Sequence, residues 1–157
     1  MIFIWFTYTN SYFLQNYLWF VTDCLGYRKE IPAFSASRSQ SKTLGRWEII
    51  LFDKVWTNVG NGFNPKTGKF TAPQSGLYQF SGTVMSAKNN LLYVFLFKND
   101  KPTVSFYAGV GYDTGTMNMV FKLQKGETVY MKHHNITQTI YSNANVHCVF
   151  SGFLISQ

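Results

Sequence analysis

The chain has 157 residues, of which 46% are hydrophobic, 18% aromatic and only 13% charged. That length fits one domain with a short extension, and the apolar content excludes an intrinsically disordered chain. The formal net charge of +7 favours acidic partners such as anionic glycans, lipopolysaccharide or acidic proteins. The basic residues are scattered, which is also typical of a mildly basic solvated surface and argues against a nucleic-acid partner.

Residues 1–30 are hydrophobic but match neither a secretion signal nor a membrane anchor. No basic segment precedes the apolar stretch, no small-residue cleavage site follows it, and polar residues between 7 and 16 interrupt it. Three interpretations remain: a degenerate export signal, an extension that packs on the domain, or an incorrectly assigned start of the coding region. The first and third are favoured, and residues 31–157 are treated as the folded domain. A membrane-anchored form would depend on residues 1–22.

The two cysteines, Cys24 and Cys148, fit neither a metal-site spacing nor a dense disulfide framework. Cys148 lies in the apolar run VHCVFSGFLIS, which predicts a buried small side chain. The residues leave open whether the two cysteines pair.

From Ile31 onward a two-residue hydrophobic period predicts strands joined by turns. Segment 64–70 (NPKTGKF) is predicted to be a turn with a positive φ at Gly68. In 76–84 the even positions from Gly76 to Val84 form the buried face, and in 116–124 the odd positions from Met117 to Leu123 do so. Segments 98–101 (KNDK) and 124–128 (QKGET) read as tight turns.

Segment 91–98 (LLYVFLFK) is apolar on both faces of the predicted strand. An antiparallel strand of this kind needs cover on both sides, either from another subunit or from further elements of a thick single-chain sandwich. About nine or ten short strands in this length predict a sandwich, jelly roll or barrel.

Seven residues recur at fixed intervals in FDKVWTNVGNGFNPKTGKFTAPQSGLYQF: Phe52, Asn58, Phe63, Phe70, Gly76, Tyr78 and Phe80. This spacing resembles the signature of the complement C1q globular-head family, within the tumour-necrosis-factor-like jelly rolls. Segments 31–37 and 150–156 resemble that family's first and last strands, so the resemblance covers roughly 32–157. One position departs from the pattern, because Gly82 stands where the family usually has an aromatic residue, and the local packing must therefore differ.

The resemblance implies an all-β jelly-roll sandwich of two antiparallel sheets with an N-terminal hydrophobic extension. It also implies a trimer, in which one face of strand 91–98 would fill the sandwich and the other would line the threefold axis. Gly76 is expected to let the chain enter its strand without a Cβ clash, with Tyr78 and Phe80 facing the core.

No catalytic motif is recognised: the sequence has no Gly-x-Ser-x-Gly elbow and no close pair of carboxylates. We expect no enzyme activity and no resident metal. His133 and His134 are neighbours on a strand and should point to opposite faces, so they cannot easily bind one metal ion. His147 is alone, and all three histidines are interpreted as structural or surface residues. Some family members bind calcium, for which the loops offer Asn89, Asn90 and Asp113, but a preferred carboxylate is missing.

Ligand recognition on this scaffold would use loops. The candidate residues combine aromatic rings, which stack on sugars, with amide, carboxylate and ammonium groups: Lys88, Asn89, Asn90, Tyr107, Tyr112 and Asp113. Asn135-Ile136-Thr137 is a glycosylation sequon if the chain is exported.

Two functions fit these observations. The first is a secreted, extracellular trimer without a collagen stem that binds microbial or anionic glycans in a lectin-like way, as in innate immunity. The second is a secreted signalling or synapse-organising trimer that binds a protein receptor. The residues do not identify the ligand, nor whether the trimer would be homomeric or heteromeric.

Overall fold

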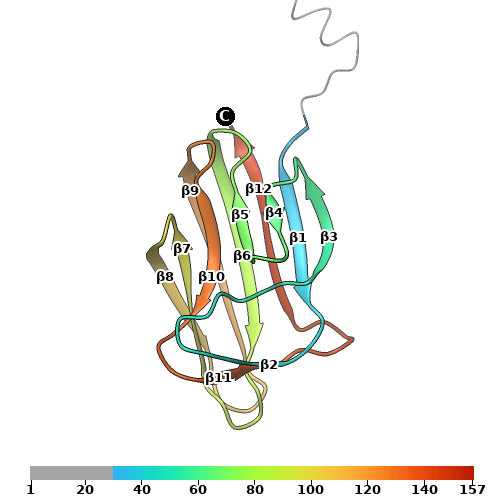
Figure 1. The fold of residues 1–157 in the computed structure, drawn as a ribbon, viewed down its shortest axis with the longest axis vertical. Coiled ribbons are helices and arrows are strands. Elements are labelled where there is room, and N and C mark those ends of the chain that lie inside the picture. The colour runs from blue at the N-terminus through green and yellow to red at the C-terminus, as the bar shows by residue number, and fades with distance from the viewer. Residues whose placement is uncertain (1–29) are drawn as a thin grey trace, which may run out of the picture. The chain divides into compact units, whose positions relative to one another are not determined.

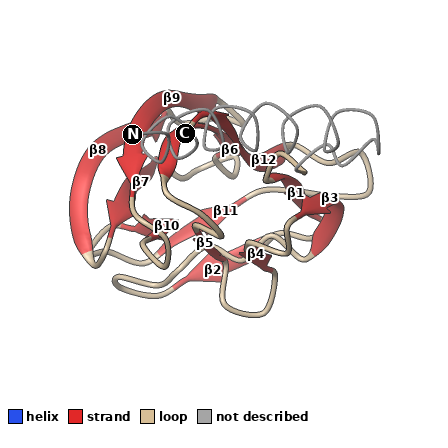
Figure 2. Ribbon diagram, turned by 90° about the horizontal axis from the view of Figure 1, so that it is seen from above, coloured by secondary structure: helices blue, strands red, loops and turns tan. Residues whose placement is uncertain are grey.

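Two antiparallel five-stranded sheets face each other in the computed structural model, which describes residues 30–157 (Figures 1 and 2). The first sheet has the order β3 (Lys54–Val59), β1 (Ala33–Arg38), β12 (Cys148–Ser156), β6 (Gly76–Met85) and β9 (Thr114–Leu123). The second has the order β4 (Phe63–Asn64), β5 (Lys69–Thr71), β10 (Thr128–His133), β7 (Leu92–Lys98) and β8 (Lys101–Ala108). A short pair, β2 (Lys42–Leu44) and β11 (Gln138–Ile140), lies at one end.

The predicted all-β jelly roll is confirmed. Residues 31–157 cluster as one compact unit. Among residues 30–157 there is no helix long and apolar enough to cross a bilayer.

The two-residue period places every second side chain of β6 and β9 between the sheets. Along β6 the buried residues alternate from Gly76 to Val84, and β9 buries Met117 and Leu123 while Thr116, Asn118 and Lys122 face outward. The predicted faces of both strands are confirmed. Aromatic rings fill the space between the layers: the Phe34 ring stacks on Phe63 with a centroid distance of 4.8 Å and meets Phe150 edge-on at 5.0 Å.

The residues of the family-like spacing are core and turn residues. Its aromatic members Phe52, Phe63, Phe70, Tyr78 and Phe80 are all buried. The Asn58 side chain closes the β3–β4 loop, because its Nδ2 donates to the Phe63 carbonyl (2.9 Å) and its Oδ1 accepts from the Phe63 amide (3.0 Å). The buried Tyr78 hydroxyl donates to the Gln74 carbonyl at 2.8 Å and so fixes the turn that precedes β6.

Residue 76 must be a glycine because the neighbouring strand β12 leaves no room for a side chain there. A Cβ there would lie 2.5 Å from both Leu154 Cδ1 and the Ser156 carbonyl oxygen, as expected for a residue that enters its strand against a neighbour.

Gly82 stands where an aromatic residue was expected, and two methionines fill the space that such a side chain would occupy. A Cβ on Gly82 would lie 2.8 Å from Met131 Cε and 3.0 Å from Met117 Cε. Met131 belongs to β10 of the opposite sheet and Met117 to the neighbouring strand β9. Flexible thioether side chains suit such an irregular gap. The space that a large side chain on β6 would occupy is therefore filled from its neighbours.

The three predicted turns are present, and the positive φ expected at Gly68 is confirmed. Gly68 has φ 70° in the β4–β5 turn, and a Cβ there would lie 2.6 Å from the Ile50 carbonyl oxygen. The β7–β8 hairpin turns through Asn99 (φ 47°) and Asp100 (φ 63°), which is the pattern of a two-residue type I′ turn. Gly126 (φ 89°) lies in the turn at 124–127 that connects β9 of the first sheet to β10 of the second, where the Glu127 amide donates to the Gln124 carbonyl at 3.1 Å.

Strand β7 buries one face in the sandwich and presents the other on the outside of the second sheet. Leu92, Val94 and Leu96 are fully buried in the core. On the other face, the Phe97 ring stacks on the Tyr130 ring with a centroid distance of 5.4 Å. The Phe95 ring lies 5.9 Å from the Trp47 ring, again between centroids. Part of the cover therefore comes from the same chain, so the second apolar face does not by itself require another subunit.

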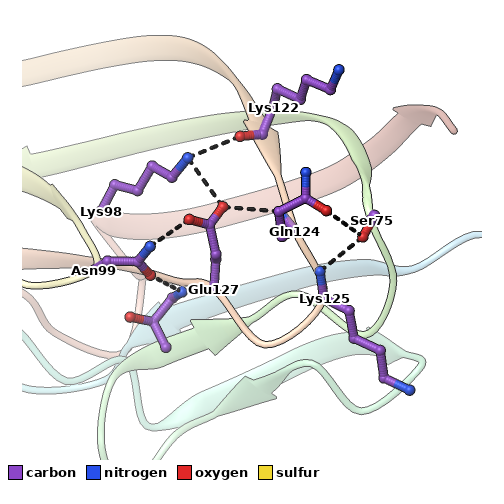
Figure 3. A network of polar contacts seen from close by, with 8 residues as sticks. Ser75, Lys98, Asn99, Lys122, Gln124, Lys125 and Glu127 are labelled. Carbon is purple, nitrogen blue, oxygen red and sulfur yellow. Dashed lines mark hydrogen bonds and ion pairs between the residues drawn. The ribbon is translucent and has the colours of Figure 1, made fainter.

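A polar network fixes three turns at the end of the sandwich that carries the C-terminus (Figures 1 and 3). The Glu127 carboxylate accepts from the Gln124 amide (2.9 Å), from Lys98 Nζ (3.1 Å) and from Asn99 Nδ2. Ser75 extends the network to the β5–β6 turn by donating to Gln124 Oε1 and accepting from the Lys125 amide, each at 3.0 Å.

Replacing Gly82 by Phe should lower stability by about 1–3 kcal/mol, because the ring overlaps Met131 and Met117. Met131→Ala alone should also destabilise, by about 2–5 kcal/mol, since it leaves a cavity. The two changes together should cost clearly less than their sum in urea unfolding. Additive losses would show that Met131 does not fill the space beside Gly82.

Acid should weaken the network around Glu127. The Gln124 amide bond, helped by Lys98 and Asn99, holds the pKa of Glu127 below its ordinary value of 4.5. The carboxylate therefore stabilises the fold fully above that ordinary value, and this contribution is lost as the pH falls through the lowered pKa. Urea midpoints between about pH 7 and pH 3 should fall less steeply for Glu127→Gln than for the wild type.

A matched control is Glu30→Gln, because the side chain of Glu30 is exposed. Its profile should follow the wild type. Parallel profiles for Glu127→Gln and the wild type would contradict a stabilising role of the Glu127 carboxylate.

Candidate functional site

Three loops meet at the end of the sandwich opposite the C-terminus (Figure 1). The Ser86 amide in the β6–β7 loop donates to the Asp113 carbonyl in the β8–β9 loop (2.9 Å). The Ala87 amide donates to Thr139 of β11 (3.1 Å) and Tyr141 donates to Met85 (2.8 Å), so the β11–β12 segment joins the same end. This loop end contains five of the six residues predicted to bind ligand: Lys88, Asn89, Asn90, Tyr112 and Asp113.

Two of these five residues use their polar atoms within the loops. The Asp113 carboxylate accepts from the Gly109 amide at 2.7 Å and closes its own loop. The Asn90 side-chain oxygen accepts from the Thr139 amide at 3.2 Å. Lys88 and Asn89 are exposed. Residues 30–157 contain no group of three His, Cys, Asp or Glu side chains that could hold a metal ion, and calcium binding through Asn89, Asn90 and Asp113 stays a prediction.

Tyr112 is presented by a left-handed backbone, with φ 62°. Its ring meets Tyr141 edge-on at a centroid distance of 4.7 Å, and Tyr141 in turn stacks on His147 at 5.4 Å. The three rings form a ladder from the β8–β9 loop to the β11–β12 loop. His147 is thus half-buried against Tyr141, and its interpretation as a structural or surface residue stays a prediction.

Tyr107, the sixth candidate, lies on strand β8 next to the β8–β9 loop and not in a loop itself. It is 62% exposed on β8 and pairs across the sheet with Tyr93 of β7. Since paired residues share a face, both rings lie on the outside of the second sheet. The Tyr93 hydroxyl bonds to Ser105 Oγ at 3.1 Å; Ser105 lies two residue pairs further along, on the same face of the sheet.

A group of aromatic side chains continues this surface. His134 follows β10, donates its amide to the Tyr93 carbonyl (3.0 Å), and lies 5.0 Å from the Tyr93 ring and 5.6 Å from Phe95. Trp47 lies 5.4 Å from His134 and is 41% exposed. We call this surface the Trp47 face; its members are Trp47, Tyr93, Phe95, Tyr107 and His134. Sequence reasoning found only Tyr107 of this set as a candidate, because the strand pairing that unites the five is non-local.

The adjacent histidines point to opposite sides of the second sheet, as predicted. His133 is fully buried, with Nδ1 3.0 Å from the Gly45 carbonyl oxygen and Nε2 2.8 Å from Gln138 Oε1. His134 lies on the outer Trp47 face. The two imidazoles therefore do not converge on a common ligand.

The carboxylates of the domain are engaged in internal bonds. Asp23 and Glu30 precede Ile31, so residues 31–157 contain five of the chain's 7 acidic groups: Glu48, Asp53, Asp100, Asp113 and Glu127. Each accepts a hydrogen bond from another residue. The Tyr130 hydroxyl and Lys69 lower the pKa of Asp100, for example. The described residues form three ion pairs, so most of the 12 basic side chains in 31–157 have no anionic partner in that part of the chain.

Cys148 is a buried free thiol. Its Sγ donates to the Tyr141 carbonyl at 3.1 Å and accepts from the Met85 amide at 3.3 Å. Burial raises the pKa of Cys148 to about 11. The predicted buried side chain is confirmed, whereas Cys24 lies outside the described residues.

The sequon Asn135-Ile136-Thr137 forms the exposed loop between β10 and β11. It follows His134 directly and so borders the Trp47 face. Its glycosylation stays a prediction.

The chain belongs to the C1q domain family, whose model matches residues 33–155. It is 34% identical to human complement C1q tumor necrosis factor-related protein 3 over 68% of this chain and 44% of that protein. It is 33% identical to zebrafish (Danio rerio) Caprin-2 over 80% of this chain but 14% of that protein. Heavy metal-binding protein HIP of Mytilus edulis is 30% identical over 78% of this chain and 60% of its own length. The matched part of the chain thus covers at most 60% of the length of each of these relatives.

Solved structures agree on the fold. The globular domain of zebrafish complement 1qA superposes with a TM-score of 0.66 at 24% identity, covering 80% of this chain and 98% of that chain. Murine APRIL gives a TM-score of 0.62 at 8% identity, covering 80% of this chain and 99% of that chain. These likenesses show the jelly-roll fold shared by C1q and tumour-necrosis-factor-like proteins.

The Cys148 thiol should resist alkylation in the folded protein, because it is buried and mostly protonated at neutral pH. Iodoacetamide treatment of the full chain at about pH 7.5, followed by peptide mapping, should label Cys148 only after denaturation. Rapid labelling of Cys148 in the native protein would contradict the packing of β12 described above.

Proposed function

We propose that this chain is a secreted, extracellular binding protein that recognises anionic glycans of microbial surfaces, in the manner of a lectin and without catalysis. The observation that carries the proposal is the excess of 12 basic over five acidic side chains in residues 31–157, where only three basic side chains form ion pairs. Because the 12 basic side chains of 31–157 outnumber the five acidic ones, the domain carries a net positive charge. Aromatic side chains exposed on the same domain suit sugar rings.

We propose the same division of the chain that the sequence suggested, with an extension over 1–30 and a globular head over 31–157. The family relationship supports the head. Export would allow the sequon at Asn135 to carry a glycan.

We also propose that three heads assemble through the outer face of the first sheet. This replaces the expectation that strand 91–98 (β7) lines the threefold axis, because the outer face of β7 is partly covered by side chains of the same chain. Phe153 of β12 is 46% exposed there and pairs with Gln79 of β6, which pairs with Val120 of β9. Phe153 and Val120 therefore share one row across the sheet, with the exposed Ile155 close by on β12. Exposed apolar side chains grouped on one sheet face favour association, and a cyclic trimer closes such a contact.

Phe153→Arg should convert the trimer to monomers, since it places a charge in the proposed interface. Analytical ultracentrifugation of the full chain checks this. Ile136→Arg is the matched control, because Ile136 is equally exposed at 46% but lies in the β10–β11 loop. A monomeric wild type, or equal effects of the two variants, would overturn the proposed interface.

Glycan binding is tested with the full chain on arrays of bacterial polysaccharides, lipopolysaccharide, and anionic and neutral glycans, at about 0.15 M and about 0.5 M salt. Selective binding to anionic glycans that weakens but persists at high salt is expected, because both charge and ring stacking contribute. If binding disappears at about 0.5 M salt, net charge alone explains the interaction and a shaped lectin-like site is contradicted. Absence of all glycan binding would overturn the proposal in favour of a protein receptor.

A further inference from the structure

The turn that carries Trp47 is strained. Residues 45–48 form a turn in which the Glu48 amide approaches the Gly45 carbonyl at 3.4 Å, and Trp47 occupies its third position with φ 54°. That backbone region favours glycine, and a bulky aromatic residue there is a genuine outlier. Such strain persists only where the surroundings impose it, and it is concentrated at ligand-binding sites.

The surroundings of this turn do impose it. The Glu48 carboxylate accepts from the Gly45 amide at 2.7 Å and pairs with Lys42. The buried His133 ring bonds to the Gly45 carbonyl, and the Trp47 amide donates to the His134 carbonyl at 3.2 Å. Although burial alone raises the pKa of Glu48, the Lys42 and Gly45 bonds outweigh it and lower the pKa, so this brace stays ionised at neutral pH. Trp47 is thus held in place while it remains partly exposed.

The neighbouring side chains complete a surface with two kinds of chemistry. Tyr107 and Tyr93 pair in one row of the second sheet, and Lys132 pairs with Phe95 in the next row. The Lys132 ammonium lies 5.2 Å above the Phe97 ring. The exposed Arg46 precedes Trp47. The sheet positions in these rows, on β10, β7 and β8, carry aromatic, hydroxyl and ammonium groups and no carboxylate.

From this arrangement we infer that the Trp47 face is the sugar-binding subsite of the domain and takes a pyranose ring that bears a carboxylate. The ring's C–H face stacks on Trp47. Lys132 and Arg46 pair with the carboxylate, and the hydroxyls of Tyr93 and Tyr107 bond to the sugar hydroxyls. This inference rests on the proposed function, but it moves recognition from the loop end to the outside of the second sheet.

The probe for the test is a hyaluronan octasaccharide, which contains glucuronate. The full chain is used with Asn135→Gln throughout, so that a glycan of its own cannot cover the face. Trp47→Ala should weaken binding about tenfold or more, and Lys132→Gln severalfold, by calorimetry at about 0.15 M salt. Trp56→Ala is the matched control: Trp56 is 58% exposed on β3 of the other sheet and also lies under a lysine, Lys54. The Trp56→Ala variant should bind the octasaccharide with the same affinity as the protein that carries only Asn135→Gln.

A fourth variant separates folding from binding. Trp47→Gly relieves the left-handed backbone, so it should melt at a higher temperature than Trp47→Ala while binding equally poorly. If the octasaccharide binds the Trp47→Ala and Trp56→Ala variants equally well, the Trp47 face is not the subsite, although the proposed function stands. If the unmutated protein binds neither this probe nor any other anionic glycan, the proposed function falls and the subsite with it.

Discussion

The packing of aromatic rings between the two sheets is the interaction on which the rest of the molecule depends. Phe34, Phe70, Phe80 and Phe150 come from four strands of both layers, and their rings meet at centroid distances between 5.0 and 6.4 Å. Fully burying one such ring stabilises the fold by roughly 1.5–3 kcal/mol. Because each ring needs its neighbours in register, this core fixes which side of every strand faces inward and hence which side is free.

The outward-facing side chains give residues 31–157 their net positive charge and their exposed apolar surfaces. The carboxylates of 31–157 are used to close loops and turns, as Asp113 does at the loop end and Glu127 does beside Asn99. Apart from the buried Arg38, the basic side chains are at least partly exposed, which gives the domain its positive character without any dense basic segment. The two sheets also present different outer surfaces: apolar Phe153 and Val120 on the first, and the Trp47 face on the second.

Local patterns predicted strands and turns that leave a sandwich, jelly roll or barrel open, and the resemblance of one spacing to a known family implied the jelly roll. The alternation in β6 and β9, the turn at Gly68 and the hairpin at Asn99-Asp100 are encoded within a few residues each. The spacing from Phe52 to Phe80 implied the jelly roll through its resemblance to the C1q family, and in the structure its members fill the core or close its loops. The departure at Gly82 predicted altered packing, but only the structure shows that Met131 of the opposite sheet fills the space.

The candidate site was predicted less well, for a physical reason. Lys88, Tyr112 and Asp113 were chosen as loop residues, and the structure does bring their loops together. Trp47 and His134 were missed as partners of Tyr107, because no sequence interval reflects the contacts that join them. Tyr93 pairs with Tyr107 and contacts His134, and the Trp47 amide donates to the His134 carbonyl. The positive φ of Trp47 is likewise imposed by distant residues such as His133.

The central claim, that the outer face of the second sheet recognises an anionic sugar, is tested most directly by chemical-shift mapping. Amide and aromatic resonances of the full chain would be followed during titration with the hyaluronan octasaccharide. The account predicts shifts concentrated at Trp47, Tyr93, Tyr107 and His134, with little change at Lys88, Tyr112 or Phe153. Shifts confined to the loop end or to the first sheet would contradict it.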